Sequence, residues 1–188
     1  MPLTPVLLGL GSNSERERHL HAGLDALAAL LSDMHCSPVF ESLAVGYRGD
    51  NFYNLVVAGC TDLPLMELDR RLKFIEADNG RYAPDRKGLP LDIDVLLYAD
   101  LVGEFDGLRL PRPEVLRNAF VLWPLSLLVP ERIHPEVGLS FAELWRRASI
   151  DQRLWPVPFG WNGMALTPEY LLQPSPFSEP PRRRLRQR

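Results

Sequence analysis

Hydrophobic residues along the chain follow two spacings, and the changes between them predict a series of strands and helices. Residues 5–13, PVLLGLGSN, form a short apolar run that ends in a Gly-Ser-Asn turn, as expected of a strand. Leucines then recur at helical spacing as far as Ser32. Asn13 or Ser14 can cap this helix, because either side chain can accept a hydrogen bond from a free backbone N–H.

The remaining elements follow from the same two spacings. Strands are predicted at residues 37–42 and 51–61, an amphipathic helix at residues 63–78, and a fourth strand at residues 92–98. An Asn-Gly pair directly after the second helix suits its C-terminal cap. Short helices interrupted by prolines are expected in the C-terminal third of the chain.

The order strand, helix, strand, strand, helix, strand is that of a split βαβ unit. We therefore predict an α+β, ferredoxin-like sandwich, in which one antiparallel sheet carries both helices on one face. The other face is left for a ligand or for the C-terminal additions. A single domain is expected over residues 1–172. Residues 173–188 are rich in proline, serine and arginine and are expected to be disordered, because they offer little apolar surface to bury.

The composition of the chain argues against two classes of protein, nucleic-acid-binding proteins and membrane proteins. The chain of 188 residues is 46% hydrophobic and carries a net charge of −3, although five of its 21 basic residues lie in the terminal RRRLRQR. An acidic body argues against nucleic-acid binding, and the basic tail suits at most a weak acidic partner. No apolar run approaches the roughly 20 residues of a membrane span. With no visible signal peptide and only two cysteines, we expect a cytoplasmic protein with no membrane association.

Two aspartates interrupt the last predicted strand, DIDVLLY. Asp92 and Asp94 are two residues apart, so their side chains point to the same face of the sheet. Neighbouring carboxylates repel each other unless a cation or a proton lies between them, and Mg²⁺ prefers such oxygen ligands. The pair therefore indicates a magnesium site. The alternative is a polar start to a strand, with one carboxylate in water.

The loop before that strand is crowded with charge. Residues 81–91 include Arg81, Arg86 and Lys87, and Glu76 stands just before them near the end of the second helix. Such a loop is typical of a cationic lid that closes over phosphates. The same residues also suit an ordinary solvated helix end and an exposed loop.

Aromatic and amide residues open the middle strand at NFYN. Phe52 and Asn54 share one face, which suits stacking on a flat heterocycle and hydrogen bonding to its edge. Phe120, in NAFVLWP, has the same two interpretations: part of a ligand site or part of the hydrophobic core.

The order of these motifs resembles that of the 6-hydroxymethyl-7,8-dihydropterin pyrophosphokinase family of folate biosynthesis. The resemblance rests on GLGSN, NFYN, LDIDVLLY and LPRPEVLRNAFVLWPL, and covers residues 4 to 147. It implies a ferredoxin-like fold and transfer of the β,γ-diphosphate of ATP to the pterin hydroxymethyl group, with release of AMP. The partners implied are a pterin and ATP.

The resemblance also implies a role for particular residues. Asp92 and Asp94 would hold two Mg²⁺ ions that bridge the ATP triphosphate. The pterin would lie between Phe52 and Phe120, above Gly11, with Asn54 at its edge. Glu76 and Arg81 would border the nucleotide. Arg81 and Arg86 are predicted to be catalytic together with the two aspartates. Lys73, Lys87 and Arg112 are predicted to bind the nucleotide and its phosphates.

The chain departs from the family pattern at several positions. A phosphate-contacting arginine is replaced by Leu89, a histidine by Arg112 and a second arginine by Asn118, and the segment that lines the pterin pocket reads SLAVG at residues 42–46. These departures leave two alternatives open. One is a divergent paralogue that binds a pterin or nucleotide with little activity, and the other is a small interaction module that uses its basic tail.

Overall fold

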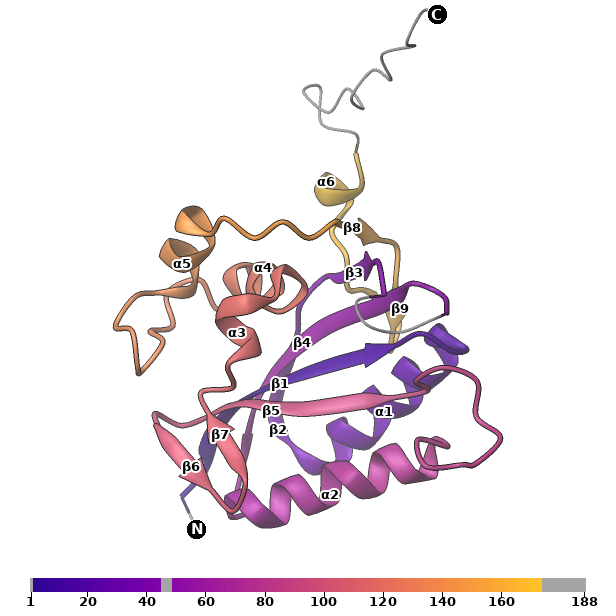
Figure 1. Ribbon diagram of the computed structural model, residues 1–188, viewed down its shortest axis with the longest axis horizontal. Coiled ribbons are helices and arrows are strands. Elements are labelled where there is room, and N and C mark those ends of the chain that lie inside the picture. Colours follow the sequence, from indigo (N-terminus) through magenta and orange to yellow (C-terminus); the bar gives the residue numbers. More distant parts are fainter. Residues whose placement is uncertain (1, 45–48, 174–188) are drawn as a thin grey trace, which may run out of the picture.

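Strands whose side chains alternate between two faces build the central sheet of the protein. The computed structural model describes residues 2–44 and 49–173 (Figure 1). Neighbouring strands of the sheet are antiparallel, in the order β5-β1-β4-β3-β8, and β2 pairs with another part of β4. The strands are β1 (Thr4–Ser12), β2 (Ser32–Cys36), β3 (Val39–Ser42), β4 (Phe52–Thr61), β5 (Asp92–Tyr98) and β8 (Leu154–Val157).

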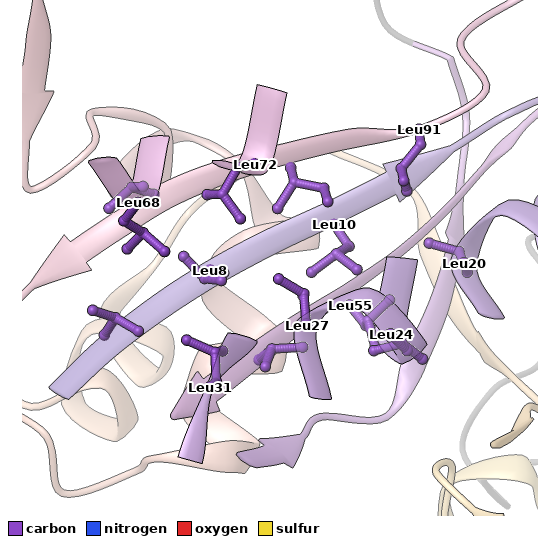
Figure 2. Close-up of a cluster of buried hydrophobic side chains, with 14 of the residues drawn as sticks. Leu8, Leu10, Leu20, Leu24, Leu27, Leu31, Leu55, Leu68, Leu72 and Leu91 are labelled. Atoms are coloured by element: carbon purple, nitrogen blue, oxygen red, sulfur yellow. The ribbon is translucent and has the colours of Figure 1, made fainter. Parts of the chain in front are cut away.

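Two amphipathic helices, α1 (Arg16–Leu30) and α2 (Leu65–Asp78), cover one face of this sheet (Figure 1). Leucines from both helices meet leucines from β1 and β4 in a buried hydrophobic layer, called here the leucine layer (Figure 2). Fully buried Leu8, Leu24 and Leu68 represent the sheet and the two helices in that layer. The predicted α+β, ferredoxin-like architecture is therefore confirmed.

The opposite face is covered by C-terminal segments. Helices α3 (Glu114–Arg117), α4 (Ala119–Leu128) and α5 (Phe141–Arg147) follow a hairpin of β6 (Gly103–Phe105) and β7 (Leu108–Leu110). Leu7, Leu96 and Leu125 belong to a second hydrophobic cluster between these helices and the sheet. This cluster covers only part of the face, and the uncovered part is where the ligand was expected.

The chain ends in a small subassembly beside α1. Strands β9 (Gly160–Trp161) and β10 (Met164–Ala165) form a hairpin, followed by α6 (Glu169–Leu172). Trp161 Nε1 donates a hydrogen bond to Asp25 Oδ1 of α1 at 2.9 Å. Among the described residues, no helix combines the length and apolar character that a bilayer crossing requires.

The predicted cap of the first helix is wrong. Neither Asn13 nor Ser14 caps α1; its N-cap is Glu15, which has a positive φ of 44° and makes no side-chain cap hydrogen bond. The amide of Asn13 binds elsewhere, because its Oδ1 accepts a hydrogen bond from Leu89 N at 2.6 Å. The helix also ends at Leu30, before the predicted Ser32, which is the first residue of β2.

Two strands of the central sheet, β2 and β8, and both small hairpins, β6–β7 and β9–β10, were not predicted from the sequence. β2 has the polar sequence SDMHC and lies mostly exposed, so no apolar alternation marks it. β8 contains a proline, which disfavours a central strand, yet Pro156 is tolerated because β8 lies at the edge of the sheet. The predicted disorder concerns residues 173–188, and all of these except Gln173 lie outside the described residues. The domain boundary after residue 172 stays a prediction.

Candidate active site

A cavity of about 310 Å³ lies between the uncovered part of the sheet and helices α3 and α4. Its floor is made by two glycines of β1. A Cβ atom at Gly11 would lie 3.1 Å from Asn54 Oδ1, and one at Gly9 would lie 3.3 Å from Leu96 Cδ2. Glycine at these positions therefore keeps the floor open. The walls include Ser42, Leu43, Phe52, Asn54, Leu89, Asp92, Asp94, Arg112, Glu114, Asn118 and Phe120.

The two aspartates of β5 occupy one end of this cavity. Asp92 and Asp94 line it together, whereas Ile93 between them is buried in the leucine layer on the other face. Arg81 Nη1 lies 3.4 Å from Asp92 Oδ1, and Arg112 Nη2 lies 3.3 Å from Asp94 Oδ1. The predicted shared face is confirmed, and two cations from distant parts of the chain meet it.

These two arginines do not balance the carboxylates. Burial raises the pKa of Asp94 to about 7, Asp92 adds to this rise, and the nearby Arg112 opposes it. Arg81 Nη1 is buried and makes no hydrogen bond to the part of the chain that the structure describes. The Asp92–Asp94 pair and the unsatisfied donor of Arg81 beside Asp92 suit a cation together with an anionic ligand.

The donor set fits a hard divalent cation such as Mg²⁺. Two carboxylates on one wall are what such an ion takes from a protein when a polyphosphate and water complete its shell. Within residues 2–44 and 49–173, no group of three or more His, Cys, Asp or Glu side chains is arranged to hold a metal. The remaining ligands would therefore come from a substrate.

Glu76 supports this wall from behind. Its side chain is only 6% exposed, and its Oε1 accepts a hydrogen bond from the backbone N–H of Ile93 at 2.7 Å. Tyr82 donates its hydroxyl to Oε2 at 3.2 Å, and burial raises the pKa of the Glu76 carboxyl. The end of α2 is thus joined to β5 between the two aspartates. The nucleotide contact predicted for Glu76 stays a prediction, since this residue is not part of the cavity wall.

The other end of the cavity is aromatic and amide in character. Phe52 and Phe120 line it from β4 and α4, and Asn54 lies beside Gly11. Asn54 Nδ2 donates a hydrogen bond to Ser42 Oγ at 2.8 Å. This bond orients the amide, so that the four residues predicted at a pterin come together around one space.

Only Arg112 of the residues predicted around the nucleotide and its phosphates is part of the cavity wall. Arg86 is exposed, and its Nη1 donates to Gly88 O at 2.9 Å. Lys87 is also exposed, and Lys73 Nζ forms an ion pair with Asp69 Oδ2 of the same helix at 2.6 Å. Their assignment to the nucleotide stays a prediction that this arrangement does not support directly.

The end of the charged loop is tied to the glycine-rich strand. Asn13 N donates to Leu89 O at 3.0 Å, and Leu89 N donates back to Asn13 Oδ1 at 2.6 Å. Gly88 is required next to this pair, because its φ is 67° and a Cβ there would lie 2.5 Å from Asn13 Oδ1. Leu89 is buried and lines the cavity, where the resemblance had implied an arginine.

Sequence reasoning did not identify Glu114 or the role of Asn13. Glu114 Oε2 lies 3.3 Å from Arg112 Nε, so it competes with Asp94 for the same guanidinium. Nothing in PRPE marks this glutamate as part of a site, because the contact depends on how a short helix packs over β5.

Comparison with known proteins agrees with this geometry. A family model for 7,8-dihydro-6-hydroxymethylpterin-pyrophosphokinase (HPPK) matches residues 7–130. The chain belongs to the HPPK family. The 2-amino-4-hydroxy-6-hydroxymethyldihydropteridine pyrophosphokinase of Aquifex aeolicus is 35% identical over 136 residues, or 71% of this chain and 85% of that protein. The enzyme of the same name from Synechocystis is 30% identical over 174 residues, covering 90% and 89%.

A solved structure shows the same fold as this HPPK-family chain. The Plasmodium falciparum HPPK-DHPS triple mutant with pteroate has a TM-score of 0.62 and 14% sequence identity, over 78% of this chain. The chain spans 43% of that larger protein. Membership of the HPPK family rests on the sequence matches, and the structural match supports the fold alone.

Proposed function

We propose that this chain transfers diphosphate from ATP to the hydroxymethyl group of 6-hydroxymethyl-7,8-dihydropterin and releases AMP, a step of folate biosynthesis. One observation carries the proposal: a single cavity has a carboxylate pair at one end and an aromatic–amide pocket at the other. The pterin occupies the aromatic end, and the triphosphate approaches the aspartates. Relatives that bear this activity in their names match most of the chain, which supports the enzyme over the non-catalytic alternatives.

Within this proposal, Asp92 and Asp94 hold the metal, which we take to be two Mg²⁺ ions. When bound, Mg²⁺ supplies positive charge that offsets the charge developing on the phosphate oxygens. Both carboxylates line the cavity from the same strand, and each would share its charge between an arginine and the metal. Glu76 keeps this wall in place through the backbone of Ile93.

Arg81 and Arg112 act on the phosphates. Each lies beside one aspartate, and Arg81 Nη1 has a donor without a hydrogen-bond acceptor among the described residues. A phosphate oxygen is a strong acceptor for a guanidinium. Fixed cations next to the transferring group stabilise the transition state without rearrangement, which is the main form of catalysis in phosphoryl transfer.

The aromatic end orients the acceptor alcohol. Phe52 and Phe120 contact the faces of the heterocycle, and Asn54 offers its carbonyl oxygen to the ring edge while its amide group is held by Ser42. A ring fixed in this way limits the positions of its hydroxymethyl oxygen. Holding the hydroxymethyl oxygen close to the phosphorus atom lowers the entropic part of the activation barrier, because the two groups are already oriented when the reaction begins.

The experiment that tests the proposal is a product analysis. The protein is incubated with Mg²⁺, ATP and 6-hydroxymethyl-7,8-dihydropterin, and nucleotides are separated by ion-exchange chromatography. We expect AMP in equal amount to the diphosphorylated pterin, and no reaction when EDTA removes the metal or the pterin is omitted. ADP as the product, or AMP that does not depend on the pterin, would contradict the proposal. The cytoplasmic location and a partner for the basic tail stay predictions.

A further inference from the structure

The segment between α5 and β8 reaches the aromatic end of the cavity. It comprises residues 148–153 and runs from α5 past α4 to the edge of the sheet (Figure 1). The family model ends at residue 130, and this segment lies after it, within the longer match to the Synechocystis relative. One of its side chains contacts Asn118 of the cavity wall and the adjacent Ala119.

That side chain is Gln152, whose amide contacts two successive residues at the start of α4. Its Oε1 accepts a hydrogen bond from Ala119 N at 2.8 Å, and its Nε2 donates to Asn118 Oδ1 at 3.1 Å. Ala119 carries the first backbone N–H of α4, a donor that has no partner within the helix. Gln152 therefore caps α4 from outside and holds the side chain of the residue before it.

Both contacted residues belong to the start of the wall that carries Phe120. Asn118 lines the cavity, and its backbone oxygen accepts hydrogen bonds from Val121 N at 3.0 Å and Leu122 N at 2.9 Å. The first turn of α4 thus begins at Asn118. Phe120 lies within this turn, so the placement of its ring depends on the residue that Gln152 holds.

Gln152 is itself tethered to the opposite wall. Two residues later, Leu154 pairs with Ser42 in the ladder between β8 and β3. Ser42 is the residue that accepts the hydrogen bond from Asn54 Nδ2. A short stretch of chain therefore joins the two sides of the aromatic end, with Gln152 at α4 and Leu154 at β3.

The geometry points to Gln152 as a positioning residue for the pterin. Through Asn118 and the first turn of α4, it sets the separation between Phe120 and the Asn54 wall. This inference rests on the proposed function, because the ligand it concerns is the pterin. The segment that contributes to pterin affinity would then lie after the residues that the family model matches. Gln152 is not expected to affect binding of the phosphates, because the aspartates and arginines lie at the other end of the cavity.

The test compares Michaelis constants for the two substrates. Gln152→Ala removes both hydrogen bonds, and we expect the KM for the pterin to rise about five- to twentyfold, as the loss of one or two neutral hydrogen bonds predicts. The KM for ATP should change by less than about twofold, because the substitution weakens the binding of the pterin and not that of ATP. Gln152→Glu keeps an acceptor for Ala119 N and can accept from a rotated Asn118 amide, so it should restore a KM close to that of the unmodified protein.

A matched control is Gln173→Ala, which removes the same side chain from an exposed position at the end of α6. Gln152→Met is measured in parallel, since it keeps the length of the side chain and removes its polar atoms. Thermal unfolding of each variant reports whether the fold is retained. The test thus does not depend on a single variant being stable.

A double-mutant cycle that combines Gln152→Ala with Asn118→Ala distinguishes positioning through Asn118 from simple capping of α4. If Gln152 acts through Asn118, Gln152→Ala should have little further effect on pterin KM in the Asn118→Ala background. An unchanged pterin KM in Gln152→Ala, an equal rise for ATP, or a full effect in the Asn118→Ala background would overturn the inference. Failure of the proposed function would look different, because the unmodified protein would then release no AMP. Pterin binding followed by ligand fluorescence supplies the comparison independently of turnover.

Discussion

The two faces of the central sheet are built from alternate residues of the same strands, yet they differ in almost every property. On β1, Leu8 and Leu10 point into the leucine layer (Figure 2). Gly9 and Gly11 of the same strand form the cavity floor. Successive residues of a strand face opposite sides, so a stretch of only a few residues serves both purposes. The two faces of the sheet differ in side-chain volume along β1 and in charge along β5.

This comparison shows how one face supports the other. Carboxylates at Asp92 and Asp94 repel each other and gain nothing from burial. They are held by the residues between and beside them, because Ile93 and Val95 are buried against the helices on the opposite face. The energy of the packed face thus keeps an otherwise unfavourable arrangement in place on the cavity face.

The largest effect is expected where the charge of the cavity face is removed. Asp92→Asn and Asp94→Asn keep the size of the side chain but weaken metal and phosphate binding, and we expect AMP formation to fall by at least about 10³-fold. Initial rates of AMP release measure this loss. Thermal unfolding should show that the fold is retained. Asp100→Asn is the control, because Asp100 is an exposed carboxylate just after the same strand.

Removing volume from the packed face should affect stability and leave the site chemistry intact. Leu24 is fully buried on α1, and Leu24→Ala is expected to lower the free energy of unfolding by about 2–5 kcal/mol. Urea denaturation measures this change. Leu3→Ala, at a position 58% exposed, should change stability by less than about 0.5 kcal/mol. A loss of kcat in folded Leu24→Ala larger than that of the aspartate variants would contradict the division between the faces.

Adding volume to the cavity face should reduce substrate binding. Gly11→Ala places a methyl group 3.1 Å from Asn54 Oδ1, and we expect the KM for the pterin to rise about tenfold or more. Steady-state kinetics with saturating ATP measures the change. Gly160→Ala is the control, because the nearest atom to a Cβ there is 3.7 Å away and its backbone needs no positive φ. An unchanged KM would show that the ligand does not lie on this floor.

The smallest effect concerns a buried histidine between α4 and α5. His134 is 2% exposed, its Nδ1 accepts hydrogen bonds from Glu136 N and Val137 N, and burial lowers its pKa below the ordinary 6.5. The unfolded chain binds the proton more readily, so this contribution is present above pH about 6.5 and is lost as the pH falls toward the folded pKa. The slope is at most about 1.4 kcal/mol per pH unit.

Thermal unfolding between pH 7 and pH 5 measures this dependence, with His134→Asn as the control. Asparagine keeps an acceptor for the two N–H groups and cannot titrate in this range. The variant should lose less stability on acidification than the unmodified protein. An identical pH profile for the two proteins would contradict the assignment to His134.

Local patterns predicted the strands and helices that carry a strong periodicity. The strand from Asp92 to Tyr98 was predicted with its observed bounds, and the Asn-Gly cap of α2 lies where it was expected. The errors occur where a distant partner decides. Asn13 was expected to cap a helix but binds Leu89, which lies 76 residues away, and β8 is a strand only because the edge of β3 is available to it.

For the site, the sequence by itself determined that Asp92 and Asp94 share one face, because the period of a strand is two. It also indicated an aromatic–amide pair in Phe52 and Asn54. Only the tertiary structure decided that both lie in one cavity, and that Arg81 and Arg112 reach the aspartates while Arg86 and Lys87 remain in solvent. The reason is that strand periodicity is local, whereas the meeting of β4, β5 and α4 depends on how the whole chain packs.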